Sequence, residues 1–509
     1  MNIKVGILGA SNSLLANGWH SVITRSFECV KHAVGGSNSG IGLYKIDENN
    51  FINNIDIAVI NFGVTEHEEL KGDFISRQHL NILISELYKP FEYSKVHCIS
   101  LLMPIKDVYD NRETDYSLSI HESACKKAGG IFIDGYKFIE TILKKSALLA
   151  TSDLFLDPHH LKPIVARFLG EVVKLAIYEI NNHEKEFAGE LKENFITFQA
   201  KTAKSFGFSE NHFVNINNSN FNEIAVKLKL HEKIRITEGD YIHGLYVDCA
   251  RSQSKIKIKN TTKSIVKNLY CRAPIIADGK PQLKFCTLYE PLEINGLTSL
   301  EIVQNNIPKT ESNRGERPLK DNLPTAYICG VLISKKVASV YECYNLANRE
   351  SIQEKVNAFI DKYAAECAEA ISLNLLDTSK IIKTLSDDQV IIDDVLADLL
   401  TLLKAKGHVD SVNNLKKIID RYNFNKVTPT DIEIIKSSKI FDTNYYLKTY
   451  PDIEKAGVDP VKHYCEFGFK EGRNPSSHFN TKNYISSKNL KTNQNPLVHY
   501  IKTINHDGA

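Results

Sequence analysis

The feature that most constrains the fold is the alternation of strand-like and helix-like segments over the first 182 residues. Short apolar runs typical of buried strands occur at 2–9, 28–34, 55–61 (IDIAVIN), 95–102 (KVHCISLL) and 130–134. Helical spacing of apolar residues follows at 77–89, 115–128, 136–148 and 163–181. Strands that alternate with helices predict a parallel sheet with helices on both faces and right-handed crossovers. We therefore expect a flavodoxin-like, three-layer α/β/α domain with a five-stranded parallel sheet over residues 1–182. Its ligand site should lie at the carboxyl ends of the strands.

The character of the sequence changes after residue 182. Residues 183–195 are charged, and we expect a helical tail or a linker there. Between 196 and 340, short alternating runs such as EIAVKLKL and TAYICGVLI are separated by turn residues, which predicts a β-sandwich or jelly-roll domain. Apolar residues at helical spacing predict a helical region over 345–440, and a repeat region follows over 441–509. The chain of 509 residues is therefore expected to be multidomain, α/β followed by all-β and helical parts.

Composition argues against several classes of protein. The net charge is +2 and no block rich in Lys and Arg stands out, so there is no electrostatic case for nucleic-acid binding. We find neither an apolar run long enough for a bilayer nor a signal-peptide pattern, and so expect no transmembrane segment. The ten cysteines are scattered without a CxxC pair, which favours reduced thiols over a disulfide framework or a zinc site. We expect a cytoplasmic protein, associated with the inner membrane only through partners.

A serine at the end of the first predicted strand is the candidate nucleophile. The opening MNIKVGILGASNS stops being apolar at Gly9, and Ser11 then stands where α/β sheets place their ligands. A serine needs a base, and the segment SDLFLDPHHLKP supplies Asp157 and His160 at a spacing that sets a carboxylate against one imidazole nitrogen. The AVGGSNSG loop lets the N–H of Gly36 join that of Ser11 as an oxyanion donor.

Plainer interpretations of these residues stay open at this point. Ser11 also suits the cap of a following helix, and Ser13 is a rival nucleophile. Taken alone, His160 is more often a hydrogen-bonded structural histidine, and Asp157 before a proline is also a turn residue. The joint placement of the serine, the glycine loop and the Asp–His pair favours catalysis.

Two further features are open to a functional and a structural interpretation. Trp19, the single tryptophan, either stacks on a sugar or an acyl donor or packs in the core, and packing is the more frequent role. The EHEE segment at 66–69 is interpreted as a solvated helix start rather than a metal cluster, because adjacent side chains diverge.

The order of these blocks resembles the SGNH/GDSL hydrolase superfamily over about 180 residues. The GAS segment at 9–11 is similar to the family's G-D-S block, with alanine in place of the aspartate. Gly36 matches the glycine block, and DPHH at 157–160 matches the D-x-x-H block. In NFGVTE at 61–66, Thr65 stands where the family has its oxyanion-hole asparagine.

The resemblance implies a role for each matched residue. It implies a triad of Ser11, His160 and Asp157, and an oxyanion hole formed by Ser11, Gly36 and Thr65. Asn61 is a substitute donor at the strand end. The candidates for contact with the substrate are Asn12, Trp19 and Asn61. No metal is expected.

The last seventy residues contain an imperfect repeat. The first copy runs from Phe441 to Pro475 and the second from Phe479 to Tyr500, with His463 recurring as His499. Recurring aromatic and histidine residues indicate core packing. The pattern FD-x-x-YYL…YPDI…HY…EGRNP resembles a repeat found beside bacterial glycosyltransferases and in polysaccharide-synthesis proteins.

These resemblances predict an O-acyltransferase, acetyl in the first instance, that modifies a bacterial capsular or other surface polysaccharide or its precursor. A cytoplasmic location implies acetyl-CoA as the acyl donor, with no permanently bound cofactor. The expected partners are a sugar or polysaccharide acceptor and polysaccharide-synthesis glycosyltransferases. Two alternatives stay open. One is a carbohydrate esterase (deacetylase) with the same triad, and the other is a catalytically reduced scaffold that docks such enzymes, which the Thr65 departure favours.

Overall fold

The computed structural model describes residues 3–147, 149–217, 221–271, 279–319, 324–384, 429–488, 490 and 494–506. The chain divides into two compact units, Met1–Ser379 and Lys380–Ala509, and each is described by itself. Within the described ranges, no helix is both long enough and apolar enough to cross a membrane.

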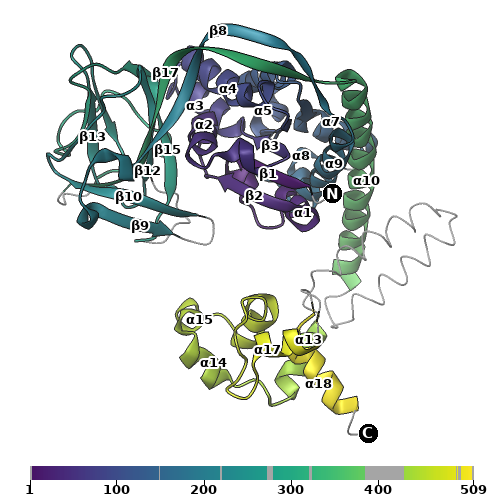
Figure 1. Cartoon of the computed structure of the whole chain (residues 1–509). Coiled ribbons are helices and arrows are strands. Elements are labelled where there is room, and N and C mark those ends of the chain that lie inside the picture. Colours follow the sequence, from purple (N-terminus) through teal and green to yellow (C-terminus); the bar gives the residue numbers. More distant parts are fainter. Residues whose placement is uncertain are drawn as a thin grey trace. The chain divides into compact units, whose positions relative to one another are not determined.

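A five-stranded parallel sheet forms the centre of the first unit and confirms the predicted fold class. Its strand order is β2-β1-β3-β4-β5, so the first strand of the chain lies inside the sheet (Figure 1). Central parallel strands are covered on both faces and need nearly continuous apolar sequence; β3 and β4 are accordingly buried along their whole length. The strands are β1 Lys4–Gly9, β2 Glu28–Ala33, β3 Ile57–Asn61, β4 His97–Leu102 and β5 Ile131–Asp134.

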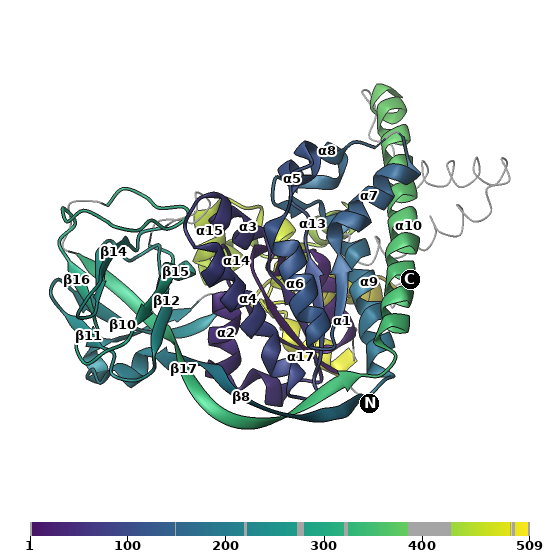
Figure 2. The ribbon, with the colours of Figure 1, turned by 90° about the horizontal axis from the view of Figure 1, so that it is seen from above.

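Helices cover both faces of this sheet. Helix α1 packs against α9 on one face, and α4 packs against α2 and α6 on the other (Figure 2). The long helices α4, α6, α7 and α9 match the predicted ones, whereas the sequence does not predict α1, α2, α3, α5 and α8, which are short. The helices are α1 Trp19–Ser26, α2 Ser39–Glu48, α3 Val64–Lys71, α4 Arg77–Glu92, α5 Lys106–Asn111, α6 Tyr116–Lys127, α7 Gly135–Lys145, α8 Thr151–Leu154 and α9 Pro163–Asn181.

The β-rich part of this unit consists of two antiparallel sheets. One sheet has the order β15-β12-β17-β10-β9 with β8 paired to β17, and the other has the order β11-β16-β13-β14. Residues from both sheets, such as Leu245 and Ile258, join one apolar core. The strands are β8 Lys185–Thr202, β9 Phe213–Asn217, β10 Asn222–Lys229, β11 Lys233–Arg235, β12 Tyr241–Asp248, β13 Lys255–Lys259, β14 Ser264–Asn268, β15 Leu283–Glu293, β16 Ser299–Val303 and β17 Thr325–Leu346.

A long two-stranded ribbon corrects the expectation of a helical tail or linker at 183–195. Strand β8 begins at Lys185 and pairs with β17 from Lys185↔Leu346 to Thr202↔Gly330. The pairing continues past the sandwich, and the ribbon runs over the α/β part toward α10 (Figure 1). The side chain of Lys185 is buried, and its Nζ donates to the carbonyl oxygens of Phe91 and Ala128. Because the partner strand lies far away in the sequence, local charge patterning gave no sign of it.

The α/β and β-rich parts share a hydrophobic core. Helix α2 lies at their contact, where the Tyr44 and Tyr246 rings are 5.2 Å apart and Lys45 Nζ is 2.6 Å from Glu223 Oε1. A Cβ atom at Gly330 would lie 2.0 Å from the Tyr44 hydroxyl, so this position of β17 requires glycine. One core cluster contains Leu8 of the parallel sheet together with Phe285 of β15. The two parts are therefore packed as one body.

Helix α10, Arg349–Thr384, covers the edge of the parallel sheet. The Gln353 side chain accepts a hydrogen bond from the Phe132 N–H at 2.9 Å and donates to the Phe132 carbonyl at 2.7 Å. Gln353 thereby pairs both backbone groups of an edge-strand residue. Residues 385–428 of the predicted helical region lie outside the described residues.

The second unit is helical and contains both copies of the repeat. The Tyr446 hydroxyl lies 3.0 Å from His463 Nδ1, and the Tyr484 hydroxyl lies 3.0 Å from His499 Nδ1. The two copies thus make the same contact, and their aromatic residues share one core with Ile435. The helices are α13 Pro429–Ser437, α14 Thr443–Thr449, α15 Pro451–Ala456, α16 Pro460–His463, the π-helix η5 Tyr464–Gly468, α17 Thr481–Lys488 and α18 Pro496–His506.

Candidate active site

Ser11 lies at the carboxyl end of β1, at the edge where parallel sheets carry their ligands. Strand β1 ends at Gly9, and the Ala10 N–H continues the sheet by donating to the Asn61 carbonyl at 3.2 Å. Ser11 then begins the short 3-10 helix η1, Ser11–Ser13. The first N–H groups of a helix have no acceptor within it, so the N–H of Ser11 is available to a ligand.

A tight β-hairpin brings a histidine and an aspartate to this serine. The hairpin consists of β6, Phe155–Asp157, and β7, His160–Leu161. His160 Nε2 lies 2.9 Å from Ser11 Oγ, and His160 Nδ1 lies 2.9 and 2.8 Å from the two carboxylate oxygens of Asp157. Since the carboxylate accepts a hydrogen bond from Nδ1–H, Nε2 of the neutral ring carries no proton and accepts from the serine hydroxyl. This is the arrangement in which an imidazole activates a serine.

The carboxylate of Asp157 is kept ionised by its partners. Partial burial raises the pKa of Asp157, but hydrogen bonds from His160 and from the His159 N–H outweigh this effect and lower it. The Lys106 N–H donates to the Pro158 carbonyl at 2.9 Å and fixes the hairpin to the loop after β4. The side chain of His160 is 19% exposed and that of Asp157 44%, so water reaches the triad.

Ser13, the rival nucleophile, is buried and its hydroxyl is hydrogen-bonded within the fold. Its hydroxyl donates to Asn61 Oδ1 at 3.0 Å, and Asn61 Nδ2 donates to the Leu101 carbonyl at 2.8 Å. A Cβ at Gly9 would lie 2.2 Å from Ser13 Oγ, so glycine is needed for this approach. Asn61 is 2% exposed, and its amide joins η1 to β4. This burial corrects its assignment as a substrate contact and as a substitute oxyanion donor.

The other two candidates for substrate contact are also buried. Asn12 Nδ2 donates to the His159 carbonyl at 3.1 Å and so connects the nucleophile turn to the histidine hairpin, while its Oδ1 has no partner. Trp19 is completely buried, and its backbone lies against Gly170 of α9. The structure therefore corrects the stacking role for Trp19 to a packing role.

The two remaining oxyanion candidates lie in the loop after β2 and in the first turn of α3. Gly36 has a φ of +69°, and a Cβ at the preceding Gly35 would lie 3.8 Å from a methyl group of Leu14, directly after η1. Thr65 is buried at the start of α3, which follows the strand next to β1. Both segments lie at the carboxyl edge of the sheet.

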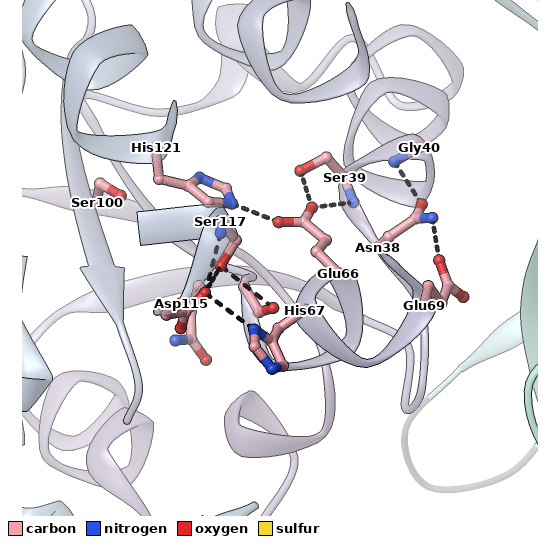
Figure 3. Close-up of polar contacts among 12 residues, drawn as sticks. Asn38, Ser39, Gly40, Glu66, His67, Glu69, Ser100, Asp115, Ser117 and His121 are labelled. Atoms are coloured by element: carbon pink, nitrogen blue, oxygen red, sulfur yellow. Dashed lines mark hydrogen bonds and ion pairs between the residues drawn. The ribbon is translucent and has the colours of Figure 1, made fainter. Parts of the chain in front are cut away.

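The segment at 66–69 differs most from its prediction. Glu66, His67 and Glu69 are buried rather than solvated (Figure 3). Only Glu68 of the four is partly exposed, and its carboxylate lies 3.5 Å from His159 Nε2. Glu66 contacts Ser39 of α2 and His121 of α6, His67 lies near Asp115 of the α5–α6 loop, and Glu69 accepts from Asn38, which directly precedes α2. These partners are distant in sequence, so no local pattern could identify them. Among the described residues, no group of three or more His, Cys, Asp or Glu side chains is arranged to hold a metal ion.

No protein-family model and no curated protein matches this chain. Among solved structures, a two-domain esterase (CEX) active on acetylated mannans is similar, with 12% identity over 66% of this chain and 92% of its own, at a TM-score of 0.41. An acetyl xylan esterase, AlAXEase, is 15% identical over 34% of this chain and 100% of its own, at a TM-score of 0.30. A catalytic mutant of Axe2, an acetylxylan esterase from Geobacillus stearothermophilus, is 13% identical over 33% of this chain and 91% of its own, at a TM-score of 0.29. At these values, the function of this chain has to be argued from its own residues.

Proposed function

We propose that this protein cleaves an O-acyl ester of a carbohydrate through a covalent acyl-enzyme on Ser11. The observation that carries the proposal is the 2.9 Å contact between Ser11 Oγ and His160 Nε2, with Asp157 on the other ring nitrogen. The serine, the glycine loop and the D-x-x-H hairpin occur in the order of the SGNH superfamily, at the same edge of the sheet. That layout supports a hydrolase-type active site and not a catalytically reduced scaffold.

The reaction has two halves. His160 takes the proton of Ser11 as Oγ attacks the acyl carbonyl, and returns that proton to the leaving alcohol as the ester C–O bond breaks. Asp157 holds the tautomer and stabilises the imidazolium. The N–H groups of Ser11 and Gly36, with Thr65 as a further donor, hold the oxyanion. In the second half, His160 takes a proton from the acceptor as the acceptor attacks the acyl carbonyl. The bond between the acyl carbon and Ser11 Oγ then breaks, and His160 gives the proton to Oγ.

Water is the acceptor that the exposure of the triad favours, which makes the protein a carbohydrate esterase. The second candidate is O-acyl transfer, with acetyl-CoA as donor and a surface-polysaccharide hydroxyl as acceptor. It is favoured by the C-terminal repeat, which resembles those of polysaccharide-synthesis proteins. Both functions share the acyl-enzyme and differ only in its acceptor.

The test combines both acceptors in one assay. The protein is incubated with acetylated oligosaccharides alone, and with acetyl-CoA plus unacetylated oligosaccharides, and products are followed by mass. Loss of 42 Da from the first set supports the esterase, and gain of 42 Da with release of free CoA supports the transferase. Absence of both, with no turnover of 4-nitrophenyl acetate, would overturn the proposal.

A further inference from the structure

The loop that carries Gly36 is hydrogen-bonded to strand β15 of the β-rich part. The Phe285 N–H of β15 donates to Ser37 Oγ at 3.0 Å. Asn38 Nδ2 donates to Thr287 Oγ1 of the same strand at 2.7 Å. Ser37 and Asn38 are completely buried, so neither bond competes with water. Ser37 and Asn38, the two residues after Gly36, are thus both hydrogen-bonded to β15.

A second set of contacts holds the same loop from α3. Asn38 Nδ2 also donates to Glu69 Oε2 at 2.6 Å, and the Ser39 N–H donates to Glu66 Oε1 at 2.8 Å (Figure 3). The Ser39 hydroxyl donates to the same carboxylate oxygen. Glu66 directly follows Thr65, so one carboxylate joins the segments that carry two oxyanion candidates.

Glu66 is itself fixed from its other side. His121 Nε2 of α6 lies 2.5 Å from Glu66 Oε2, and the Tyr88 hydroxyl lies 2.9 Å from His121 Nδ1 and 2.7 Å from Ser100 Oγ. The network is buried throughout: Glu66 is 0% exposed and His121 1%.

This cluster is not a second catalytic triad. The Ser39 hydroxyl faces the carboxylate and not the imidazole, and no member is open to a substrate. Buried ionisable groups cost free energy of desolvation and are weak sources of stability. Fully bonded buried networks do, however, specify a single local geometry.

We propose that β15 and Glu66 set the position of the Gly36 N–H and thereby build the oxyanion hole. Thr287 and Glu66 are positioning residues in this inference, which rests on the proposed function. The β-rich part then has a role in catalysis without touching the substrate. One oxyanion donor is worth on the order of 100-fold to 1,000-fold in kcat, and a displaced group loses part of that.

The test removes both side-chain bonds between the loop and β15 in the full-length chain. The double variant Ser37→Ala/Thr287→Val is compared with Tyr44→Phe, which deletes the bond from the Tyr44 hydroxyl to the Cys329 carbonyl at the same contact of the two parts. With a 4-nitrophenyl ester, we expect the double variant to lose about 10-fold to 100-fold in kcat with KM and the pH profile unchanged. Tyr44→Phe should retain wild-type kcat. Thr287→Ser, which keeps the hydroxyl, should also retain it.

A second readout separates positioning from folding. An arylboronic acid forms a tetrahedral adduct with the serine and places an oxygen in the oxyanion hole. Its affinity should fall by the same factor as kcat in the double variant. If the double variant is not soluble, Glu66→Gln is measured in the same way and should show the same parallel loss.

Failure of the proposed function and failure of the positioning inference give different results. If the wild-type protein has no Ser11-dependent turnover, the proposed function fails. If wild-type turnover depends on Ser11 but the double variant, or Glu66→Gln in its place, matches Tyr44→Phe in kcat and boronate affinity, only the positioning inference is overturned.

Discussion

His160 Nε2 lies 2.9 Å from Ser11 Oγ although the two residues are 149 positions apart in the sequence. The serine comes from the turn after the first strand of the sheet, and the histidine from a two-stranded hairpin just before α9. Asn12 connects the two segments through the His159 carbonyl. The nucleophile and its base are therefore held by the same local framework.

Replacing the nucleophile should abolish turnover and spare the fold. Ser11 is partly exposed and its hydroxyl is hydrogen-bonded to His160, so we expect Ser11→Ala to lose on the order of 10⁴-fold or more in kcat/KM with an unchanged circular dichroism spectrum. Ser13→Ala is the matched control. It should keep most activity and lose about 1 kcal/mol of unfolding free energy, because it leaves Asn61 without a buried donor. The reverse ranking would identify Ser13 as the nucleophile.

The Asp157–His160 pair should make the free energy of unfolding depend on pH in the acid range. The pKa of Asp157 is lower in the folded chain than in the unfolded one, because its hydrogen bonds from His160 and the His159 N–H outweigh its partial burial. The unfolded chain therefore takes up the proton first, and the stabilisation present above about pH 4 is lost as the pH falls through the folded pKa. The free energies of unfolding of wild type and Asp157→Asn, measured in urea, should differ most near neutral pH and converge as the pH falls through the folded pKa of Asp157. A constant difference would contradict this account.

Trp19 should affect stability and not substrate binding. Since it is completely buried, Trp19→Ala should cost about 3–5 kcal/mol of unfolding free energy. Trp19→Phe keeps most of the packing and should leave KM for an acetylated oligosaccharide unchanged. A several-fold rise in KM for Trp19→Phe, at unchanged thermal midpoint, would restore the stacking role.

Removing the second unit should spare turnover of a small ester. Ile435 shares a core with the aromatic residues of both repeat copies, so a deletion that begins at 441 would cut through that core and leave an apolar surface. A deletion of 429–509 avoids this. We expect unchanged kcat/KM for 4-nitrophenyl acetate and reduced action on a long glycan, where an extended contact raises the effective concentration. Equal loss on both substrates would show that the tail supports the active domain itself.

The sequence predicts the parts of this protein whose partners are close in the chain or whose pattern is regular. Apolar runs identify β1, β3 and β4, and Asp157 and His160 are recognised because they are three residues apart. The sequence does not predict the first part of β8, because its partner β17 is distant in the chain. The charged residues at 183–195 are also typical of a linker. Glu66 is missed for the same reason: its buried neighbours, Ser39 and His121, come from other helices, and a carboxylate in a charged segment is normally solvated.

The pairing of β8 with β17 also has a consequence for biosynthesis. Ser11, Asp157 and His160 leave the ribosome before β15, Leu283–Glu293, and before the partner of β8, since the pairing extends as far as Leu346. Contacts between such distant segments form late, after the intervening chain is available. If β15 holds the Gly36 loop as proposed, a nascent chain that already contains the serine, the aspartate and the histidine is still catalytically immature until β15 has been synthesised and has packed against that loop.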